Sequence, residues 1–215
     1  MSDSEPSRAG FLLAGGMSTR MGTDKAFLNF DGRTLLDRAL MVMQTVCNRV
    51  AIVGDPAKFA NCFANYDAGS VIADIFPGCG PLAGIHSALA HSVAEFNLML
   101  AVDMPFVTAE LLSFLFAAAE KNAAVVTVPR VTASPATVAA VNDGLQPLCA
   151  VYRRDFAAAA ERALQAGSYK IDALFSSVST HVIEAAELAA AGFSARNFFN
   201  VNTPQDRVTG ERDKF

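Results

Sequence analysis

Short runs of consecutive apolar residues alternate with helix-like segments over the first 122 residues of the chain. Uninterrupted apolar runs are typical of strands that are covered on both faces, as in a parallel sheet. We expect strands over residues 9–14, 50–53, 71–74 and 97–102, and helices over residues 35–47, 57–65, 82–92 and 108–121. This alternation predicts an α/β fold with a doubly wound, mainly parallel sheet and right-handed crossovers.

The pattern is less regular after residue 122. Strand candidates lie at residues 124–128, 137–141, 148–152 and 182–183, and Ala-rich helical segments at 156–164 and 185–191. We interpret this half as antiparallel strands and a substrate-facing wall added to the same sheet. Because no repeat or linker divides the chain, we expect a loose tail at residues 1–8 and a single domain over residues 9–215.

Local signals mark the start of the first helix. Asp31-Gly32 is a turn dipeptide, and Thr34 is a candidate N-cap. Asp37 stands three residues after Thr34, at the position that a capping box gives to Glu. We therefore expect a turn followed directly by a capped helix.

Composition and charge narrow the class of protein. With 215 residues, of which 52% are hydrophobic and 18% charged, the chain has a core-forming composition. A net charge of −4 argues against broad binding to nucleic acid or to anionic membranes. The four cysteines are scattered without a Cys-x-x-Cys pair, so neither a zinc site nor an iron–sulfur site is supported. Reduced thiols and the short first apolar run predict a cytoplasmic protein without a signal peptide or membrane span.

The first apolar run ends in a polar loop that is a candidate phosphate site. Gly15-Gly16 lets a ligand approach the backbone, and free N–H groups together with Arg20 and Lys25 form a plausible cradle for a polyphosphate. The alternative is that these cations are solvated surface charges and that Asp24 is a turn carboxylate. The spacing matches neither the dinucleotide-binding glycine motif nor the Walker loop.

Two carboxylates follow later strands of the expected sheet. Ligands of open α/β sheets bind beyond the carboxyl ends of the strands, where Asp74 and Asp103 lie with Gly15. Asp103 either caps the following turn or holds a hard divalent ion, and the glycine loop favours the metal. Asp74 either ends its strand or accepts hydrogen bonds from a nucleoside. His86 is the one histidine close to a glycine-rich turn, although a core or surface position is the commoner fate.

Five motifs in chain order carry a family resemblance. They are Leu13-Ala-Gly-Gly-Met-Ser-Thr-Arg-Met-Gly-Thr-Asp-Lys25, Gly80-Pro-Leu-Ala-Gly84, Asp103-Met-Pro105, Gln146-Pro-Leu-Cys-Ala-Val-Tyr-Arg153 and Asn200-Val-Asn-Thr-Pro-Gln-Asp206. Together they resemble the nucleotidyltransferases of GT-A-like fold. Asp24-Lys25, where nucleotide-sugar enzymes carry Pro-Lys, narrows the resemblance to the molybdenum cofactor guanylyltransferases (MobA proteins).

The resemblance implies a Mg²⁺-dependent transfer of GMP from GTP to the phosphate of molybdopterin or its molybdenum-loaded form, with release of pyrophosphate. It implies transient partners in cofactor biosynthesis and acceptor enzymes. The implied nucleotide-binding residues are Leu13, Ala14, Gly15, Gly16, Lys25, Asp74 and Asp103. Arg20 and Lys25 would contact phosphates, Asp103 would hold Mg²⁺, and Asn200 and Asn202 would lie near the metal or the pterin.

Two departures from the family pattern bear on the site. Gly54 stands where the family often has Asn, so a side-chain contact from that position is lost, and the loop before Asp24 is one residue shorter than in some members. Two other functions stay open at this stage. One is a sister enzyme that uses CTP on the same pterin or makes another nucleotide conjugate, and the other is a non-catalytic nucleotide-binding protein.

Overall fold

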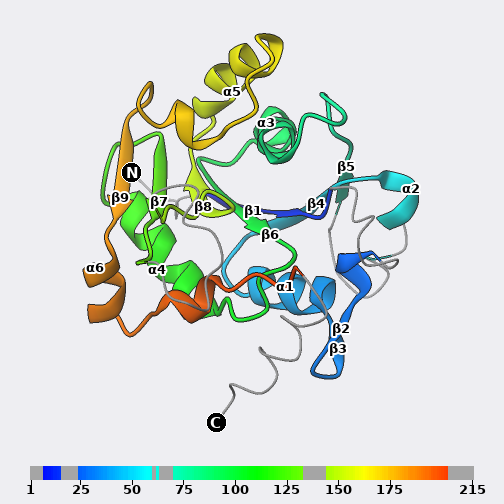
Figure 1. The fold of residues 1–215 in the computed structure, drawn as a ribbon, viewed down its shortest axis with the longest axis vertical. Coiled ribbons are helices and arrows are strands. Elements are labelled where there is room, and N and C mark those ends of the chain that lie inside the picture. The colour runs from blue at the N-terminus through cyan, green and yellow to red at the C-terminus, as the bar shows by residue number, and fades with distance from the viewer. Residues whose placement is uncertain (1–6, 16–23, 60–61, 63–69, 133–143, 203–215) are drawn as a thin grey trace, which may run out of the picture.

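The structure, a computed structural model, describes residues 7–15, 24–59, 62, 70–132 and 144–202 (Figure 1). Its centre is a seven-stranded sheet in the order β5-β4-β1-β6-β8-β7-β9. The strands are β1 (Arg8–Leu13), β4 (Arg49–Val53), β5 (Ser70–Ile72), β6 (Phe96–Ala101), β7 (Val126–Pro129), β8 (Cys149–Tyr152) and β9 (Thr180–Ile183). Only β8 runs antiparallel to its two neighbours, so the prediction of a mainly parallel sheet with antiparallel pairing in the second half is confirmed.

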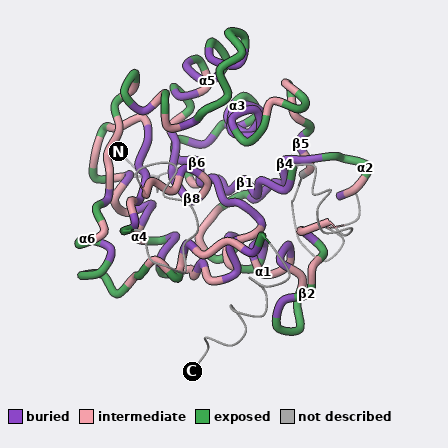
Figure 2. Tube along the Cα trace, viewed as in Figure 1, coloured by how far each residue is buried: buried purple, intermediate pink, exposed green. Residues whose placement is uncertain are grey.

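Helices cover both faces of this sheet (Figure 1). One face carries α3 (Pro81–His91) and α5 (Phe156–Gln165), and the other carries α1 (Leu35–Gln44), α4 (Ala109–Glu120) and α6 (Ala185–Ala190). Within β1, Leu12 packs into the α1–α4 core, whereas Phe11 and Leu13 pack into the α3–α5 core. Burial on both faces explains why β1 is an uninterrupted apolar run, and Figure 2 shows the buried strands between the helical layers.

A small hairpin leads into α1. Its strands are β2 (Asn29–Phe30) and β3 (Arg33–Thr34), and Asp31 and Gly32 between them have φ values of 56° and 82°. These left-handed conformations suit the tight turn of a two-residue hairpin. The Thr34 hydroxyl accepts a hydrogen bond from the Asp37 N–H at 3.0 Å and donates one to the Asp37 carboxylate at 2.7 Å, which confirms the predicted cap.

Several boundaries differ from the sequence expectation. β1 begins at Arg8, within the stretch expected to be a tail, because the backbone of Arg8 pairs with Phe96 of β6. Its side chain also forms an ion pair with Glu120 at 2.7 Å. α1 ends at Gln44, three residues early, because Asn48 turns the chain into the sheet through hydrogen bonds with the backbone of Arg8. β9 spans four residues and pairs with β7, so it is longer than the edge strand expected at 182–183.

The remaining elements are short. They are α2 (Pro56–Phe59) and the 3₁₀ turns η1 (Lys25–Phe27), η2 (Asp172–Leu174) and η3 (Ala195–Phe198). The helix expected over residues 57–65 is represented by α2, and most of its second half lies outside the described residues, as does the strand expected at 137–141. Among the helices that the structure describes, none combines the length and apolarity needed to cross a bilayer.

Gly54 gives a test of the packing at the end of β4. A Cβ atom there would lie 2.9 Å from Cε2 of Phe59, a fully buried ring that has little room to move. Gly54→Ala is therefore expected to lower the free energy of unfolding by about 1–3 kcal/mol, measured by urea denaturation. Adding Phe59→Leu should relieve the clash, so the double variant should lose less than the sum of the two single losses. An additive loss would contradict this account.

Candidate functional site

The carboxyl ends of β1, β4 and β6 are joined by hydrogen bonds just beyond the strands. The Ala14 N–H donates to the Val53 carbonyl at 3.0 Å, and the Val102 N–H donates to the Leu13 carbonyl at 3.2 Å. These bonds continue the parallel pairing and bring the segments that follow the three strands to one edge of the sheet. This is the edge at which open α/β sheets bind ligands.

At this edge, Lys25 meets two oxygen atoms from distant parts of the chain. Its Nζ lies 3.2 Å from Oδ2 of Asp103 and 2.6 Å from Oδ1 of Asn202. The Lys25 and Asp103 side chains keep 25% and 18% of their surface exposed, so solvent and small molecules can reach them. The arrangement provides a cation, a carboxylate and an amide oxygen within one small volume.

The backbone after η3 carries Asn202 to this place. The Val201 N–H donates to the Asp103 carbonyl at 2.8 Å, and Val201 itself is buried. Asn197 within η3 donates from Nδ2 to the Phe106 carbonyl at 3.2 Å, which connects the segment to the residues after β6. Asn200 is half-buried directly before Val201, so both predicted asparagines flank the residue that pairs with Asp103.

Asp24 and Lys58 support the turn that contains Lys25. Oδ1 of Asp24 accepts the Ala26 N–H at 3.0 Å, and Oδ2 forms an ion pair with the Lys58 ammonium group. The interpretation of Asp24 as a turn carboxylate is thus confirmed, whereas the sequence carries no signal for its contact with Lys58. No local motif connects Lys58 with Asp24, because 34 positions separate them in the sequence and the contact depends on the fold.

Asp74 lies beyond β5, close to two glycines. A Cβ atom on Gly15 would lie 3.5 Å from Oδ2 of Asp74, and one on Gly84 would lie 3.7 Å from Oδ1. The adjoining Ile75 N–H donates to the Ser87 hydroxyl at 2.8 Å, which holds this segment on α3. Oδ1 of Asp74 is buried and has no hydrogen-bond partner among the described residues, and burial raises the pKa of the carboxyl.

A buried carboxylate oxygen without a partner is unfavourable in the protein alone. The Asp74 carboxylate is therefore suited to accept an N–H or O–H group from a ligand at this edge. Asp74 lies next to Gly15, the residue from which the loop after β1 continues. Its contact with a nucleoside stays a prediction.

The other predicted site residues divide into two groups. Leu13 and Ala14 are buried with their side chains in the two cores, so a ligand at the sheet edge would meet their backbone. Gly16 and Arg20 lie outside the described residues. The structure therefore brings Lys25, Asp103 and Asn202 together and sets Asp74 beside Gly15, and it does not describe the rest of the predicted phosphate loop.

His86 belongs to the interior. It is buried on α3, and its ring packs edge-on against Phe76 with 5.2 Å between the ring centres. Its Nδ1 atom has no hydrogen-bond partner in the part of the chain that the structure describes. The expectation of a core or surface position is confirmed for this histidine.

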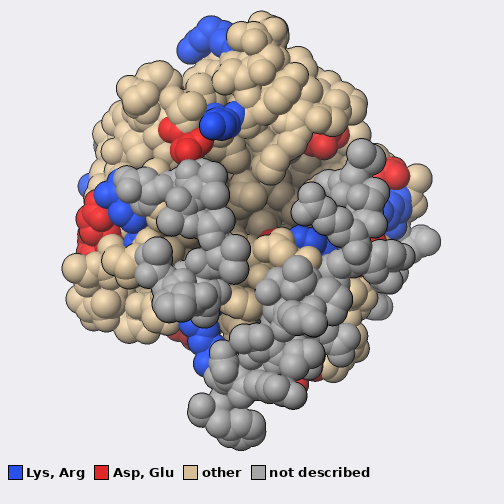
Figure 3. Space-filling view, viewed as in Figure 1, with Lys and Arg blue, Asp and Glu red and all other residues tan. Residues whose placement is uncertain are grey.

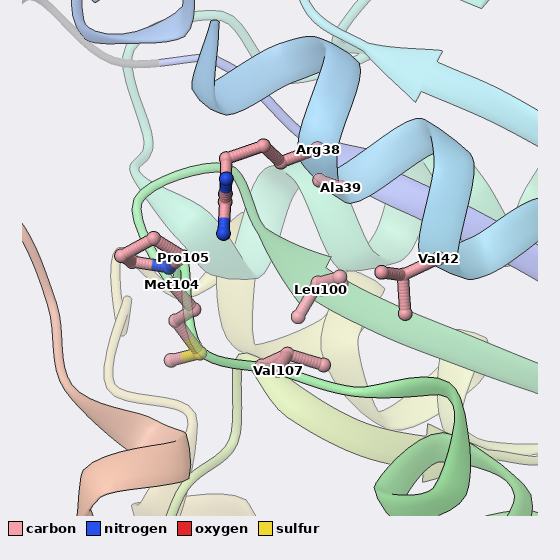
Figure 4. Close-up of a pocket in the computed structure, with 7 residues that line it drawn as sticks. All are labelled: Arg38, Ala39, Val42, Leu100, Met104, Pro105 and Val107. Atoms are coloured by element: carbon pink, nitrogen blue, oxygen red, sulfur yellow. The ribbon is translucent and has the colours of Figure 1, made fainter. Parts of the chain in front are cut away.

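A separate small cavity of about 40 Å³ lies between α1 and the segment after β6 (Figure 4). Its lining is Arg38, Ala39, Val42, Leu100, Met104, Pro105 and Val107. Arg38 extends from α1 toward Met104 and Pro105 (Figure 4), and its guanidinium also lies over the Phe30 ring at 5.5 Å. The cavity is mostly apolar and has space for little more than a water molecule, so it is not the nucleotide site.

The donor set at Lys25 fits a hard divalent cation. Asp103 and Asn202 offer oxygen ligands that already converge on one positive charge. Among the described residues there is no cluster of three or more His, Cys, Asp or Glu side chains that would form a complete protein cage. Mg²⁺ does not need such a cage, because it commonly uses one or two protein oxygens together with waters and substrate phosphates.

On the face seen in Figure 3, acidic and basic side chains are interspersed.

Comparisons with known proteins find relatives over most of the chain. Residues 10–182 match the family described as the MobA-like NTP transferase domain. A molybdenum cofactor guanylyltransferase of Desulfosudis oleivorans is 31% identical over 205 residues, which are 94% of this chain and 93% of the relative. One of Syntrophotalea carbinolica is 29% identical over 91% of this chain and 86% of the relative.

Solved structures share the fold. Molybdopterin-guanine dinucleotide biosynthesis protein A from Archaeoglobus fulgidus has a TM-score of 0.78 and 27% identity, over 94% of this chain and 96% of that chain. The 4-diphosphocytidyl-2C-methyl-D-erythritol synthase from Anaerococcus prevotii has a TM-score of 0.69 and 14% identity, over 96% and 97% of the two chains. At that identity the second likeness indicates the fold alone.

The raised pKa of Asp74 predicts a pH-dependent stability effect. A carboxyl whose pKa is higher in the fold contributes stability below its ordinary pKa of 3.8, and this contribution is lost as the pH rises through the raised value. Asp74→Asn cannot ionise, so its melting temperature should exceed that of the wild type at about pH 7, and the difference should shrink toward about pH 4. Thermal unfolding followed by circular dichroism measures both.

Glu161→Gln, which removes one charge from the exposed face of α5, is the matched control. If Asp74→Asn is less stable than the wild type by the same amount at every pH, burial of the charged form is not the dominant effect at this position.

Proposed function

Because the chain belongs to the MobA-like NTP transferase family, we propose that it transfers GMP from GTP to the phosphate of molybdopterin or its molybdenum-loaded form. The observation that carries the proposal is the cluster of Lys25, Asp103 and Asn202 at the carboxyl edge of the sheet. Such a cluster is suited to the triphosphate of a nucleotide. The names of the relatives support GTP and molybdopterin as the two substrates.

The reaction makes one bond and breaks another at the α-phosphorus of GTP. A phosphate oxygen of the acceptor attacks this phosphorus, and the bond to the bridging oxygen breaks so that pyrophosphate leaves with the electron pair. The attacking oxygen is already anionic, so no general base is required. What the protein has to supply is in-line positioning of the two phosphates and neutralisation of their charge.

Lys25 supplies part of that neutralisation. Its ammonium group is held by Asp103 and Asn202 and is accessible, so it can bind a phosphate oxygen that enters the site. Arg20 is proposed to act on the same triphosphate, as the sequence predicts. A preorganised cation is effective here because it stabilises charge on the leaving pyrophosphate without reorganising during the reaction.

Asp103, assisted by Asn202, is proposed to hold Mg²⁺. When bound, the ion would polarise phosphoryl oxygens and neutralise charge as a Lewis acid. The backbone of Leu13, Ala14, Gly15 and Gly16 and the Asp74 carboxylate are proposed to bind the guanine nucleoside, and Asn200 is proposed to face the pterin. We also propose that residues 9–215 act as one domain in the cytoplasm, with transient partners that deliver the pterin and receive the product.

The choice of nucleotide is tested with a panel of the four common NTPs. The protein is incubated with molybdopterin, Mg²⁺ and each NTP, and released pyrophosphate is measured. We expect the rate with GTP to exceed each of the others by about tenfold or more. A preference for CTP would reassign the chain to a sister cytidylyltransferase, and no release with any NTP would favour a non-catalytic nucleotide-binding protein.

The role of Asp103 is tested by Asp103→Asn. Loss of the carboxylate charge should lower kcat by about 100-fold or more, because this charge orients Lys25 and is the proposed metal ligand. Glu161→Gln on α5 removes an equivalent charge far along the chain and should keep wild-type kcat. Circular dichroism spectra of both variants check that the fold is retained. An unchanged kcat for Asp103→Asn would remove Asp103 from the mechanism.

A further inference from the structure

The short helix α2 is attached to the turn that carries Lys25 by two different contacts. The first is the ion pair between Lys58 and Oδ2 of Asp24, the residue directly before Lys25. Because Oδ1 of Asp24 accepts the Ala26 N–H at 3.0 Å, both carboxylate oxygens have a partner and the carboxylate bridges α2 and η1. The backbone on each side of Lys25 is thereby connected to Lys58.

The second contact is aromatic. The rings of Phe27 and Phe59 stack with 5.8 Å between their centres and 28° between their planes. Phe59 is fully buried and fills the space beside Gly54, where a Cβ atom would clash with it. The Lys58 ammonium group lies 4.7 Å from the centre of the Phe59 ring, so the cation is held between the ring and Asp24.

We propose that Lys58 is a positioning residue that acts through Asp24 to hold Lys25 in the site. The turn is fixed on one side by α2 and on the other by the contacts of Lys25 with Asp103 and Asn202. Loss of the Lys58–Asp24 ion pair leaves only the stack of Phe27 on Phe59 between α2 and η1, so the turn is less constrained and the ammonium group of Lys25 can shift with it. A misplaced charge stabilises the leaving pyrophosphate less well, so the effect falls on catalysis.

Because this ion pair is partly exposed, a positioning role for Lys58 in catalysis can be told apart from a contribution to the stability of the fold. The side chains of Lys58 and Asp24 keep 25% and 29% of their surface exposed, and ion pairs at such sites contribute little to folding. Removing the Lys58 charge is therefore expected to leave the melting temperature nearly unchanged. A purely structural role would instead change stability and leave kcat intact.

The kinetic experiment compares Lys58→Met, Lys58→Arg and Asp24→Asn with the control Lys121→Met, which removes an exposed lysine at the end of α4. Met keeps the apolar stem over Phe59 but loses the charge. We expect about a tenfold loss of kcat for Lys58→Met, with a change in KM for GTP below about threefold. Lys58→Arg should recover most of the loss, Asp24→Asn should reproduce it, and Lys121→Met should match the wild type.

The kinetic readout rests on the proposed function. A second readout, the rate at which Lys25 is acetylated, does not depend on the reaction. Brief treatment with acetic anhydride followed by mass spectrometry gives the acetylation rate of Lys25, with the exposed Lys170 as reference. Lys25 should react several-fold faster in Lys58→Met and Asp24→Asn than in the wild type or Lys121→Met, because its ammonium group is less constrained.

The two readouts separate the possible failures. Faster acetylation of Lys25 together with lower kcat supports the proposal, and rescue of both by Lys58→Arg strengthens it. Unchanged acetylation of Lys25 overturns it, whatever the rate does. If the wild type releases no pyrophosphate from GTP, the proposed function fails and the acetylation rates alone decide whether Lys58 positions Lys25. If Lys58→Met does not fold, Asp24→Asn carries the comparison.

Discussion

One ammonium group connects the parts of this chain that form its site. Lys25 Nζ joins Asp103, 78 positions away, and Asn202, 177 positions away, at the carboxyl edge of the sheet. The two oxygens come from segments that are also joined by a backbone hydrogen bond, and Asp103 follows β6, which pairs with β1. The Lys25 side chain therefore adds a further link between segments that the backbone already brings together. The fold of the first half and the last described segment therefore depend on one another at this point.

At Asp74, a feature that suits ligand binding lowers the stability of the fold. One oxygen of Asp74 is buried and has no hydrogen-bond partner in the part of the chain that the structure describes, and Gly15 and Gly84 lie close to the carboxylate. Neutralising this carboxyl would remove the cost of burying its charge. The unpartnered oxygen is consistent with a ligand that completes the site, since sites for ligands commonly retain such unfavourable features.

The sequence predicts the local features well because each depends on neighbouring residues. The apolar run of β1, the left-handed turn at Asp31-Gly32 and the Thr34 cap all follow from short-range patterns. The insertion of β8 between β6 and β7 does not, because strand order is decided by long-range pairing. The same limit applies to the contacts of Lys58 with Asp24 and of Asn202 with Lys25, which only the folded chain brings together.

The central proposal is that Asp103, which holds the Lys25 ammonium group, also holds a divalent cation beside it. Binding of Mn²⁺, followed by electron paramagnetic resonance in wild type and Lys25→Met with and without GTP, tests it most directly. The account predicts that Lys25→Met binds Mn²⁺ at least as tightly as the wild type without nucleotide, because a neighbouring positive charge is gone. It also predicts that GTP strengthens Mn²⁺ binding less in the variant than in the wild type, because Lys25 no longer helps to bind the triphosphate. Weaker binding of Mn²⁺ by Lys25→Met in the absence of nucleotide would contradict it.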